Sequence, residues 1–430
     1  MLKASTRRRS RLKNILGGSA GNLVEWFDWY VYASFALYFA PAFFPKGNQT
    51  AQLLQTAAIF AVGFLMRPIG AWIMGIYADH RGRKEGLTLS VSLMCAGSLM
   101  IALAPTYAQA GLLSPAILLL ARMTQGLSLG GEYGASATYM SEMADRSRRG
   151  FWSSFLYVTI IGGQLAALIL LVFLQAVLGE QAMHSWGWRF GFAAGALLAI
   201  VVFFIRRGLD ETLSYENVAA SAGRRRSSMM TLFREHPREA LLVVGITAGG
   251  TAAFYAYTVY MQKFLVNTSG FSRATASQIM TLALFLMLLI QPFAGRLSDF
   301  TGRRSVMMFF GICGTLFTYP IFATLAHTRG AGAAFALVMA GLVMLTGYTS
   351  INAIVKAELF PADIRALGVA LPYALANTIF GGTAEYIALW LKNAGREPWF
   401  YIYISLLCAI YLICVLKMRE TQTTSLIEED

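Results

Sequence analysis

Charged residues are scarce in this 430-residue chain, at 13% of the total, whereas 57% of the residues are hydrophobic. The mean hydropathy is +0.55, which excludes an ordinary water-soluble domain of this length. The short segments of alternating hydrophobicity that mark a membrane barrel are lacking as well. Apolar runs of roughly 20 residues or more, about 12 in number, instead predict an all-α protein whose helices cross a membrane.

Residues that bind metals or perform covalent chemistry are also few. The chain has four cysteines and four histidines, and no cluster of them with carboxylates has the spacing of a metal site. It lacks the Gly-x-x-x-x-Gly-Lys-Ser/Thr pattern of an ATP-binding loop and any constellation of nucleophile and base. We therefore predict no metal, no cofactor and no enzymatic activity, and expect ion gradients to drive any transport.

Positive charge is unevenly distributed along the chain, whose formal net charge is +13. Lysine and arginine gather in the N-terminal tail, at Arg81 to Lys84, at Arg146 to Arg149 and at Arg206 to Arg238. If these segments are cytoplasmic, the alternate loops hold few basic residues, and the positive-inside rule places both termini in the cytoplasm. Because the charges are divided among short loops, the sequence argues against nucleic-acid binding.

One motif occurs twice, 220 residues apart, after the second apolar run of each half. Its first copy contains Gly75, Asp79, Gly82 and Arg83-Lys84, and its second contains Gly295, Asp299, Gly302 and Arg303-Arg304. The repeat predicts a duplicated unit. The expected parts are a six-helix half over 1–206, a cytoplasmic linker over 207–238, a second six-helix half over 239–417 and a frayed cytoplasmic tail over 418–430.

The repeated motif is expected at the cytoplasmic surface, away from the middle of the membrane. We predict that its residues either latch the two halves together in the outward-facing state or only fix the topology. These gate residues are Asp79, Gly82, Arg83, Asp299, Gly302, Arg303 and Arg304.

Two carboxylates lie in the first apolar run, where a charge at the bilayer centre costs at least about 2.5 to 3.5 kcal/mol. At about 100° per residue, Glu25 shares a helix face with Asn22 and Tyr32, and Asp28 lies at the edge of that face. A carboxyl group in an apolar environment holds its proton more tightly and can exchange it near neutral pH. We predict either that one of the two carries a proton, Glu25 before Asp28, or that they pair with a nearby arginine.

Two arginines are expected deep in the membrane. Arg67 precedes Asp79 by about 18 Å along its helix, which puts it at the depth of Glu25. Arg122 lies on the fourth apolar run, whose polar face also carries Gln125, Glu132, Tyr133 and Ser136. Because arginine keeps its charge, each guanidinium must face a carboxylate of the protein or of a ligand.

The seventh apolar run has a hydroxyl-rich face suited to a polar solute. It is formed by Thr247, Thr251, Tyr255, Thr258 and Gln262. Lys263 lies about 100° from this face, so it either snorkels to the membrane surface or turns inward at a local break of the helix. Other polar residues in apolar runs either bridge helices or contact a ligand, and these are Gln164, Gln291, Asn352, Asn377 and Glu385.

Four segments resemble the metabolite:proton symporters, a branch of the major facilitator superfamily. They are Gly21–Asp28, Phe64–Gly70, Gln125–Gly134 and Leu359–Arg365. The order of six helices, a basic linker and six more helices is also similar to that superfamily, whose fold consists of two six-helix halves. The resemblance implies a proton-coupled carrier in the bacterial inner membrane for an organic acid or an osmolyte, such as α-ketoglutarate, citrate, shikimate, or proline and betaine.

Two further segments, Tyr260–Thr268 and Phe380–Tyr386, are similar to family members that carry α-ketoglutarate. Within them, Gln262-Lys263 and Glu385 depart from most of the branch, which points to substrate choice. His80 stands where many superfamily members have arginine or lysine, and the loop motif remains plausible as a gate. Gly162-Gly163-Gln164 replaces the proline-containing element of drug antiporters, which counts against drug export.

The resemblance implies that a dicarboxylate enters with protons, fixed cations bind its carboxylates, and carboxyl groups load the protons. The substrate-binding residues implied are Arg67, Arg122, Lys263, Asn22, Tyr32, Gln125, Tyr133, Gln164, Tyr255, Gln262 and Arg189. The proton-coupling residues implied are Glu25, Asp28 and Glu132. The expected partners are a small organic acid, protons and membrane lipid, and the expected state is a monomer.

Several alternatives stay open at this point. The substrate could be a tricarboxylate, an aromatic acid or a zwitterionic osmolyte. Arg189, at the outer end of the sixth run, could only anchor the membrane interface. A transporter-like sensor would need a signalling module, and the linker and tail are too short for one.

Overall fold

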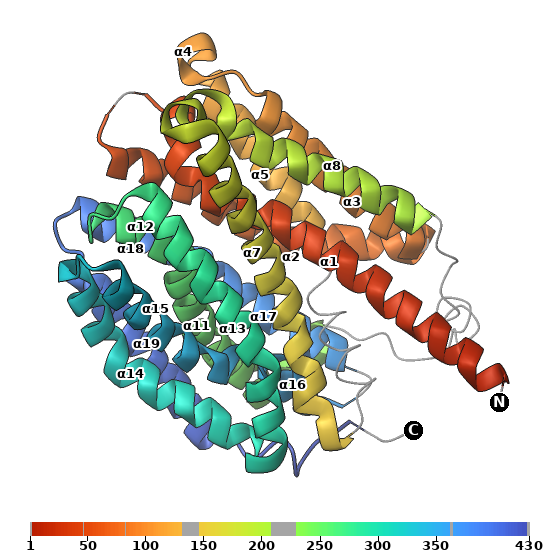
Figure 1. Ribbon diagram of the computed structural model, residues 1–430. Helices are drawn as coiled ribbons and strands as arrows, with labels where there is room; N and C mark the ends of the chain where they lie inside the picture. The colour runs from red at the N-terminus through yellow and green to blue at the C-terminus, as the bar shows by residue number, and fades with distance from the viewer. Residues whose placement is uncertain are drawn as a thin grey trace.

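The computed structural model describes residues 2–45, 47–81, 83–130, 146–207, 229–361 and 364–427, and this part of the chain is helical without strands (Figure 1). The first half contains α1 (Leu2–Phe43), α2 (Gln49–Arg81), α3 (Arg83–Leu103), the short α4 (Tyr107–Ala110), α5 (Leu113–Leu129), η1 (Arg146–Arg148), α7 (Arg149–Ala182), the π-helical η2 (Met183–Gly187) and α8 (Arg189–Arg207).

The second half begins with α10 (Met229–Glu235), which lies within the expected linker. It continues with α11 (Pro237–Tyr255), the π-helical η3 (Ala256–Tyr260), α12 (Met261–Asn267), α13 (Arg273–Thr301), α14 (Arg303–His327), α15 (Ala331–Thr349), α16 (Asn352–Glu358), α17 (Arg365–Ala376), the π-helical η4 (Asn377–Gly381), α18 (Ala384–Asn393) and α19 (Pro398–Lys417).

Many of these helices have the length and composition of membrane spans. Seven, counting helices that continue into one another, are long and apolar enough to cross a bilayer, and three shorter apolar helices lie between them in sequence. Adding α1 and the α17–η4–α18 rod gives twelve successive rods in the described chain. On the outer faces of these helices, large apolar side chains such as Leu103, Phe293 and Phe300 are mostly exposed, as lipid-facing residues are.

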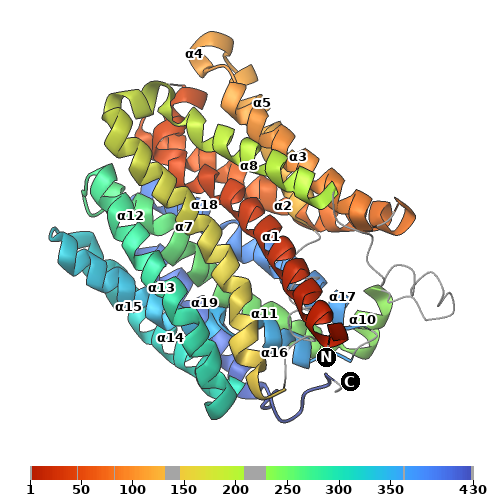
Figure 2. The same ribbon diagram turned by 45° about the vertical axis from the view of Figure 1, so that its right-hand side comes forward.

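The two halves lie side by side and meet chiefly along α7 and α13 (Figures 1 and 2). Near one end of this contact, Gly150 and Gly295 let the backbones approach so closely that a Cβ on either would collide with the carbonyl oxygen of the other. Near the other end, Glu180 of α7 accepts a hydrogen bond from Tyr38. It also forms an ion pair with Arg273 of the second half, with 2.7 Å between Glu180 Oε1 and Arg273 Nη1. Small residues allow such close helix packing in a membrane.

Within the first half, glycines bring α2 and α5 into backbone contact. A Cβ on Gly126 would overlap the carbonyl oxygen of Gly63, and one on Gly130 would overlap that of Arg67. Likewise, a Cβ on Gly70 would overlap the carbonyl oxygen of Leu127. Because the obstacles are backbone atoms, a rotamer change cannot relieve them, and the contact fixes Arg67 of α2 relative to Arg122 of α5.

The prediction that the tail is frayed is wrong for Met418–Ile427. Thr421 Oγ1 donates a hydrogen bond of 2.6 Å to Glu358 Oε2, and Arg365 Nη2 donates one of 2.7 Å to the Leu426 carbonyl oxygen. Glu420 accepts hydrogen bonds from the backbone N–H groups of Arg303 and Arg304. The tail is ordered because it satisfies polar groups at helix ends, whereas Glu428 to Asp430 lie outside the described residues.

Replacing Gly126 by alanine should weaken the α2–α5 contact. Overpacking of a tight core costs about 1 to 3 kcal/mol, so we expect a lower unfolding temperature for the purified protein in detergent. Gly332→Ala is the matched control, because nothing lies within 4 Å of a Cβ at that position. Equal unfolding temperatures for the two variants would contradict this account of the packing.

Candidate functional site

Two buried guanidinium groups lie over the same tryptophan ring where α1, α2 and α5 meet. The Cζ atoms of Arg67 and Arg122 are 4.1 Å and 3.9 Å from the Trp29 ring centroid. The exposed fractions of the two arginines are 7% and 0%. Cation–π contacts of this kind stabilise a desolvated cation by about 2 kcal/mol or more, so Trp29 helps both charges to stay inside the membrane.

A hydrogen-bond network connects Arg122 to the carboxylate of Asp28. Arg122 Nη1 donates to Gln125 Oε1 at 2.7 Å, and Gln125 Nε2 donates to Asp28 Oδ2 at 2.8 Å. Ser98 Oγ donates to Asp28 Oδ1 and accepts from Gln125 Nε2 at 2.9 Å. Asp28, at the edge of the predicted helix face, therefore joins the arginine network. The lack of a side chain at Gly195 leaves room for the Asp28 carboxylate.

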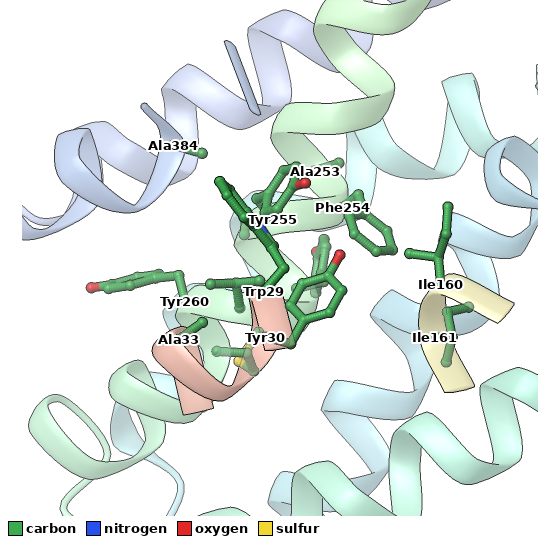
Figure 3. Close-up of a cluster of buried hydrophobic side chains, with 14 of the residues drawn as sticks. Trp29, Tyr30, Ala33, Ile160, Ile161, Ala253, Phe254, Tyr255, Tyr260 and Ala384 are labelled. Carbon is green, nitrogen blue, oxygen red and sulfur yellow. The ribbon is translucent and has the colours of Figure 1, made fainter. Parts of the chain in front are cut away.

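Arg67 keeps unused hydrogen-bond donors. Its Nε and Nη2 have no hydrogen-bond partner in the described chain, and neither does the side-chain oxygen of Asn377. The hydroxyl group of Tyr255 lies close to Tyr30, Arg67 and Asn377. Figure 3 shows Trp29 and Tyr30 of α1 beside Phe254 and Tyr255 of α11, where the two halves meet. Buried donors without partners are costly, and an anion with two oxygens could accept from both nitrogens.

The seventh rod does contain the local break that could turn Lys263 inward. The π-helical segment η3 precedes α12, and Lys263 is only 1% exposed. Its Nζ lies 2.6 Å from Glu385 Oε1, and Glu385 is 3% exposed. The snorkelling interpretation of Lys263 is therefore wrong. A π turn widens the helix and rotates the residues that follow, and a sequence pattern based on a regular helix could not place this side chain.

The hydroxyl-rich face of the seventh rod is less available than the sequence indicated. Thr251 Oγ1 and Thr258 Oγ1 each donate to a carbonyl oxygen four residues earlier in the same helix. Gln262 Nε2 donates to Ser277 Oγ at 3.1 Å. Tyr255, which belongs to the same face, lies close to Arg67.

Other predicted substrate residues make structural contacts. Asn22 Nδ2 donates to Thr159 Oγ1, Tyr32 donates to the Thr56 carbonyl oxygen, and Gln164 Nε2 donates across the halves to the Thr258 carbonyl oxygen. Arg189 Nη1 donates to the Ala102 carbonyl oxygen, and its guanidinium lies over the Trp188 ring. These contacts fit the anchoring interpretation of Arg189.

Some predicted residues cannot be placed. Glu132, Tyr133 and Gly82 lie outside the described residues, as do the side chains of Asp79 and Arg83. Glu25 is described and is 2% exposed, in the same helix as Asp28.

Two buried charged residues in apolar runs, Glu385 and Lys356, are not among the predicted site residues. For Glu385, the departure from the family pattern together with Gln262-Lys263 already points to substrate choice. Lys356 was not considered, and it is fully buried, with Nζ 3.0 Å from Asn352 Oδ1 and 4.3 Å from the Tyr373 ring centroid. A lysine inside an apolar run is itself a signal of function.

At the other candidate site, Asp299 of α13 caps α7 of the first half. Its carboxylate accepts from the backbone N–H groups of Gly150 at 2.8 Å and Phe151 at 3.2 Å. These are the second and third residues of α7, whose own N-cap residue, Arg148, makes no side-chain cap. Among the predicted gate residues with described side chains, Asp299 thus supplies a hydrogen-bonded contact between the halves.

The remaining described gate residues bind within the second half. Arg303 Nη1 lies 2.8 Å from Asp299 Oδ1, and Arg304 Nη2 donates to the Leu416 carbonyl oxygen at 2.7 Å. Gly302 has φ +88°, a left-handed conformation that favours glycine, and it allows α14 to begin directly after α13.

Comparison with known proteins identifies the family. The family model described as "Sugar (and other) transporter" matches residues 15–218 and again residues 213–430, so each half of the chain matches it. The chain belongs to this family of transporters. A protein called alpha-ketoglutarate permease from Escherichia coli K12 is 53% identical to this transporter over 96% of the chain and 95% of its own length.

Other relatives are more distant. A citrate-proton symporter of Klebsiella pneumoniae is 32% identical over 95% of the chain and 93% of its own length. A proline/betaine transporter of Salmonella typhimurium is 29% identical over 95% of the chain and 83% of its own length.

Among solved structures, the Escherichia coli xylose transporter XylE in a partially occluded inward-open conformation matches with a TM-score of 0.73. It is 18% identical and covers 94% of this chain and 97% of its own. This transporter is therefore an all-α, multi-pass membrane protein with the major facilitator fold, as the sequence predicted.

Replacing Asp299 by alanine should loosen the contact between the halves. Loss of a capping side chain costs about 0.5 to 2 kcal/mol, so we expect faster hydrogen exchange in the first turn of α7 and a lower unfolding temperature. Thr301→Ala is the control, because the exposed Thr301 hydroxyl binds only a carbonyl oxygen of its own helix. Unchanged exchange at Gly150 and Phe151 in the Asp299 variant would contradict the capping role.

Proposed function

We propose that this transporter carries a dicarboxylate of the α-ketoglutarate type into the cell together with protons, by alternating access. The main support is the pair of free donor nitrogens on the buried Arg67, at the contact between the halves. The relatives named for α-ketoglutarate and for citrate with protons support the same class of substrate. Relatives that carry proline or betaine leave a zwitterion as the second candidate, but a quaternary ammonium group would have to approach buried cations.

We further propose where the transporter lies, how it is oriented and in which state it works. The transporter lies in the bacterial inner membrane with both termini in the cytoplasm, because its basic segments require that orientation. It works as a monomer among lipids, binds no nucleic acid and catalyses no reaction.

Proton coupling follows from charge. A dianion that enters a negative cell is opposed by about 2.3 kcal/mol per charge per 100 mV, and hence by about 4.6 kcal/mol in total. Two protons that enter with the substrate cancel this cost. The carrier therefore needs carboxyl groups that are protonated in one state and ionised in another.

Asp28 is the acidic residue that the described contacts favour for this task. It shares Gln125 with Arg122, so protonation of Asp28 removes the charge that compensates the arginine. Arg122 is then free to share with Arg67 one carboxylate of the substrate, which couples proton binding to substrate binding. Glu25 and Glu132 remain candidates for a second proton.

The substrate is proposed to lie between the halves. Arg67, Tyr255 and Asn377 receive one carboxylate, and Lys263 receives the other. The other members of the proposed substrate-binding set are Arg122, Asn22, Tyr32, Gln125, Tyr133, Gln164, Gln262 and Arg189.

Asp299 is proposed as a latch of the cytoplasmic gate, together with Arg303, Arg304 and Gly302. The corresponding first-half residues are Asp79, Gly82 and Arg83. In Asp299→Ala protein, a cysteine introduced at Ser147 should react faster with a membrane-impermeant maleimide than in the Thr301→Ala control. Equal reaction rates would contradict the latch.

Arg67→Gln should abolish uptake of labelled α-ketoglutarate into proteoliposomes. The variant keeps a polar side chain but loses the charge and the paired donors, and a hydrogen bond to a charged group contributes about 1.5 to 3 kcal/mol. The control is Arg396→Gln in an exposed loop at the opposite end of the molecule from the tail. A variant of Arg67 is more informative than one of Arg122, because loss of Arg122 would also disrupt the hydrogen bonds around Asp28. Normal uptake by the Arg67→Gln protein would contradict the proposal that Arg67 binds the substrate.

Asp28→Asn should separate coupling from transport. We expect the variant to lose accumulation driven by a pH gradient but to keep exchange of internal for external substrate, because asparagine can accept the hydrogen bond of Gln125 yet cannot release a proton. Glu25→Gln is measured beside it and should reduce gradient-driven accumulation less than Asp28→Asn does. The reverse pattern would transfer the coupling role to Glu25.

A further inference from the structure

Lys263 and Glu385 meet where two rods of the second half are irregular. The seventh rod passes through η3 just before Lys263, and the eleventh passes through η4 just before α18, which carries Glu385 in its first turn. π-Helical segments inside helices are rare and are frequent at functional sites. The helix dipole at the start of α18 also favours the negative charge of Glu385.

The pair is not needed to join its two helices. At their outer ends, Lys392 Nζ of α18 donates to Thr268 Oγ1 at 2.7 Å, and Thr268 follows α12 directly. Glu397 accepts from both Lys392 and Thr268, at 3.1 Å and 2.6 Å. A second tie made of two desolvated charges would add little, because the desolvation cost of a buried ion pair can exceed its Coulombic gain.

The rod that carries Glu385 packs against α2 of the first half. Tyr32, whose ring centroid is 4.3 Å from the Arg122 Cζ atom, lies within electrostatic range of Glu385. The eleventh rod meets α2 next to this point, where Thr378 Oγ1 donates to the Phe64 carbonyl oxygen. The arginines and Lys263 therefore border the same contact between the halves.

Lys263 has donors left for another partner. An ammonium group has three donors, and the partner of Nζ in the described chain is Glu385 Oε1 at 2.6 Å. Its charge is thus balanced, while donors remain for a further acceptor.

We propose that Glu385 pairs with Lys263 where the second carboxylate of the substrate would bind. When a dicarboxylate binds, its carboxylate replaces Glu385 as the partner of Lys263. The inference rests on the proposed function and extends it from the class of substrate to the residue that selects for two carboxylates. In the empty carrier, Glu385 prevents Lys263 from being a lone cation in the membrane, which is costly. A monocarboxylate held by Arg67 leaves the ion pair closed and gains nothing from Lys263.

The test compares two ligands that differ in one carboxylate. α-Ketoglutarate and 2-oxopentanoate share a chain of five carbons and the keto group, but only the first carries the distal carboxylate. Dissociation constants are measured by thermal-shift titration of the purified full-length protein at fixed pH. The wild-type protein should prefer α-ketoglutarate.

Lys263→Met and Glu385→Gln should change this preference in opposite directions. Lys263→Met should weaken α-ketoglutarate about tenfold or more, since a lost charge-assisted hydrogen bond is worth at least one factor of ten. Glu385→Gln should tighten it by about tenfold, because the internal competitor has lost its charge. The affinity for 2-oxopentanoate should stay the same in both. If both variants weaken α-ketoglutarate equally, or if neither changes the ratio of affinities, the proposal is wrong.

A double variant guards against loss of folding. Lys263→Met with Glu385→Leu removes both charges, and buried ion pairs are often replaced by apolar residues without loss of stability. It should bind 2-oxopentanoate like the wild-type protein and lose the preference for α-ketoglutarate. A retained preference would overturn the proposal.

Lys392→Met is the matched control. It removes the α18 lysine that pairs with Glu397, and it should leave the affinities for α-ketoglutarate and 2-oxopentanoate unchanged. Failure of the wild-type protein to bind any dicarboxylate would instead refute the proposed function, so the two failures are distinguishable.

Discussion

The structure depends on one constraint, which is that a charge inside the membrane must be compensated by neighbouring groups. Arg122 reaches the carboxylate of Asp28 through Gln125, Arg67 lies over aromatic rings, and Lys263 is held by Glu385. These solutions leave bonding capacity unused. Arg67 and Arg122 each keep Nε and Nη2 without a hydrogen-bond partner in the described chain. A site for a mobile anion follows from these spare donors.

Irregular helix geometry places side chains in directions that a regular helix does not allow. The segments η3 and η4 change the direction of the side chains that follow, and they bring a lysine and a glutamate from separate rods into contact. Elsewhere, glycines in α2 and α5 shorten the distance between backbones. The charged residues of both halves thus converge on the same contact, because glycines let α2 and α5 pack closely in the first half and π-helical segments redirect side chains in the second.

Polar groups at helix ends are satisfied by segments from other parts of the chain. Asp299 caps α7 across the halves, and Glu420 of the tail caps the start of α14. In both cases, a carboxylate accepts from N–H groups that have no partner within the helix. The cap by Asp299 joins the two halves, whereas the cap by Glu420 fixes the tail to the second half.

The sequence by itself determined the membrane class, the helical fold, the duplication and the family, because these depend on local composition, on the length of apolar runs and on a repeated motif. It also pointed to Arg67, Arg122, Asp28 and Lys263, since a charge in an apolar run is conspicuous. Only the tertiary structure decided that Asp28 joins Arg122, that Lys263 points inward toward Glu385 and that the tail is ordered. These outcomes depend on π turns and on contacts between residues far apart in sequence, which helical periodicity does not encode.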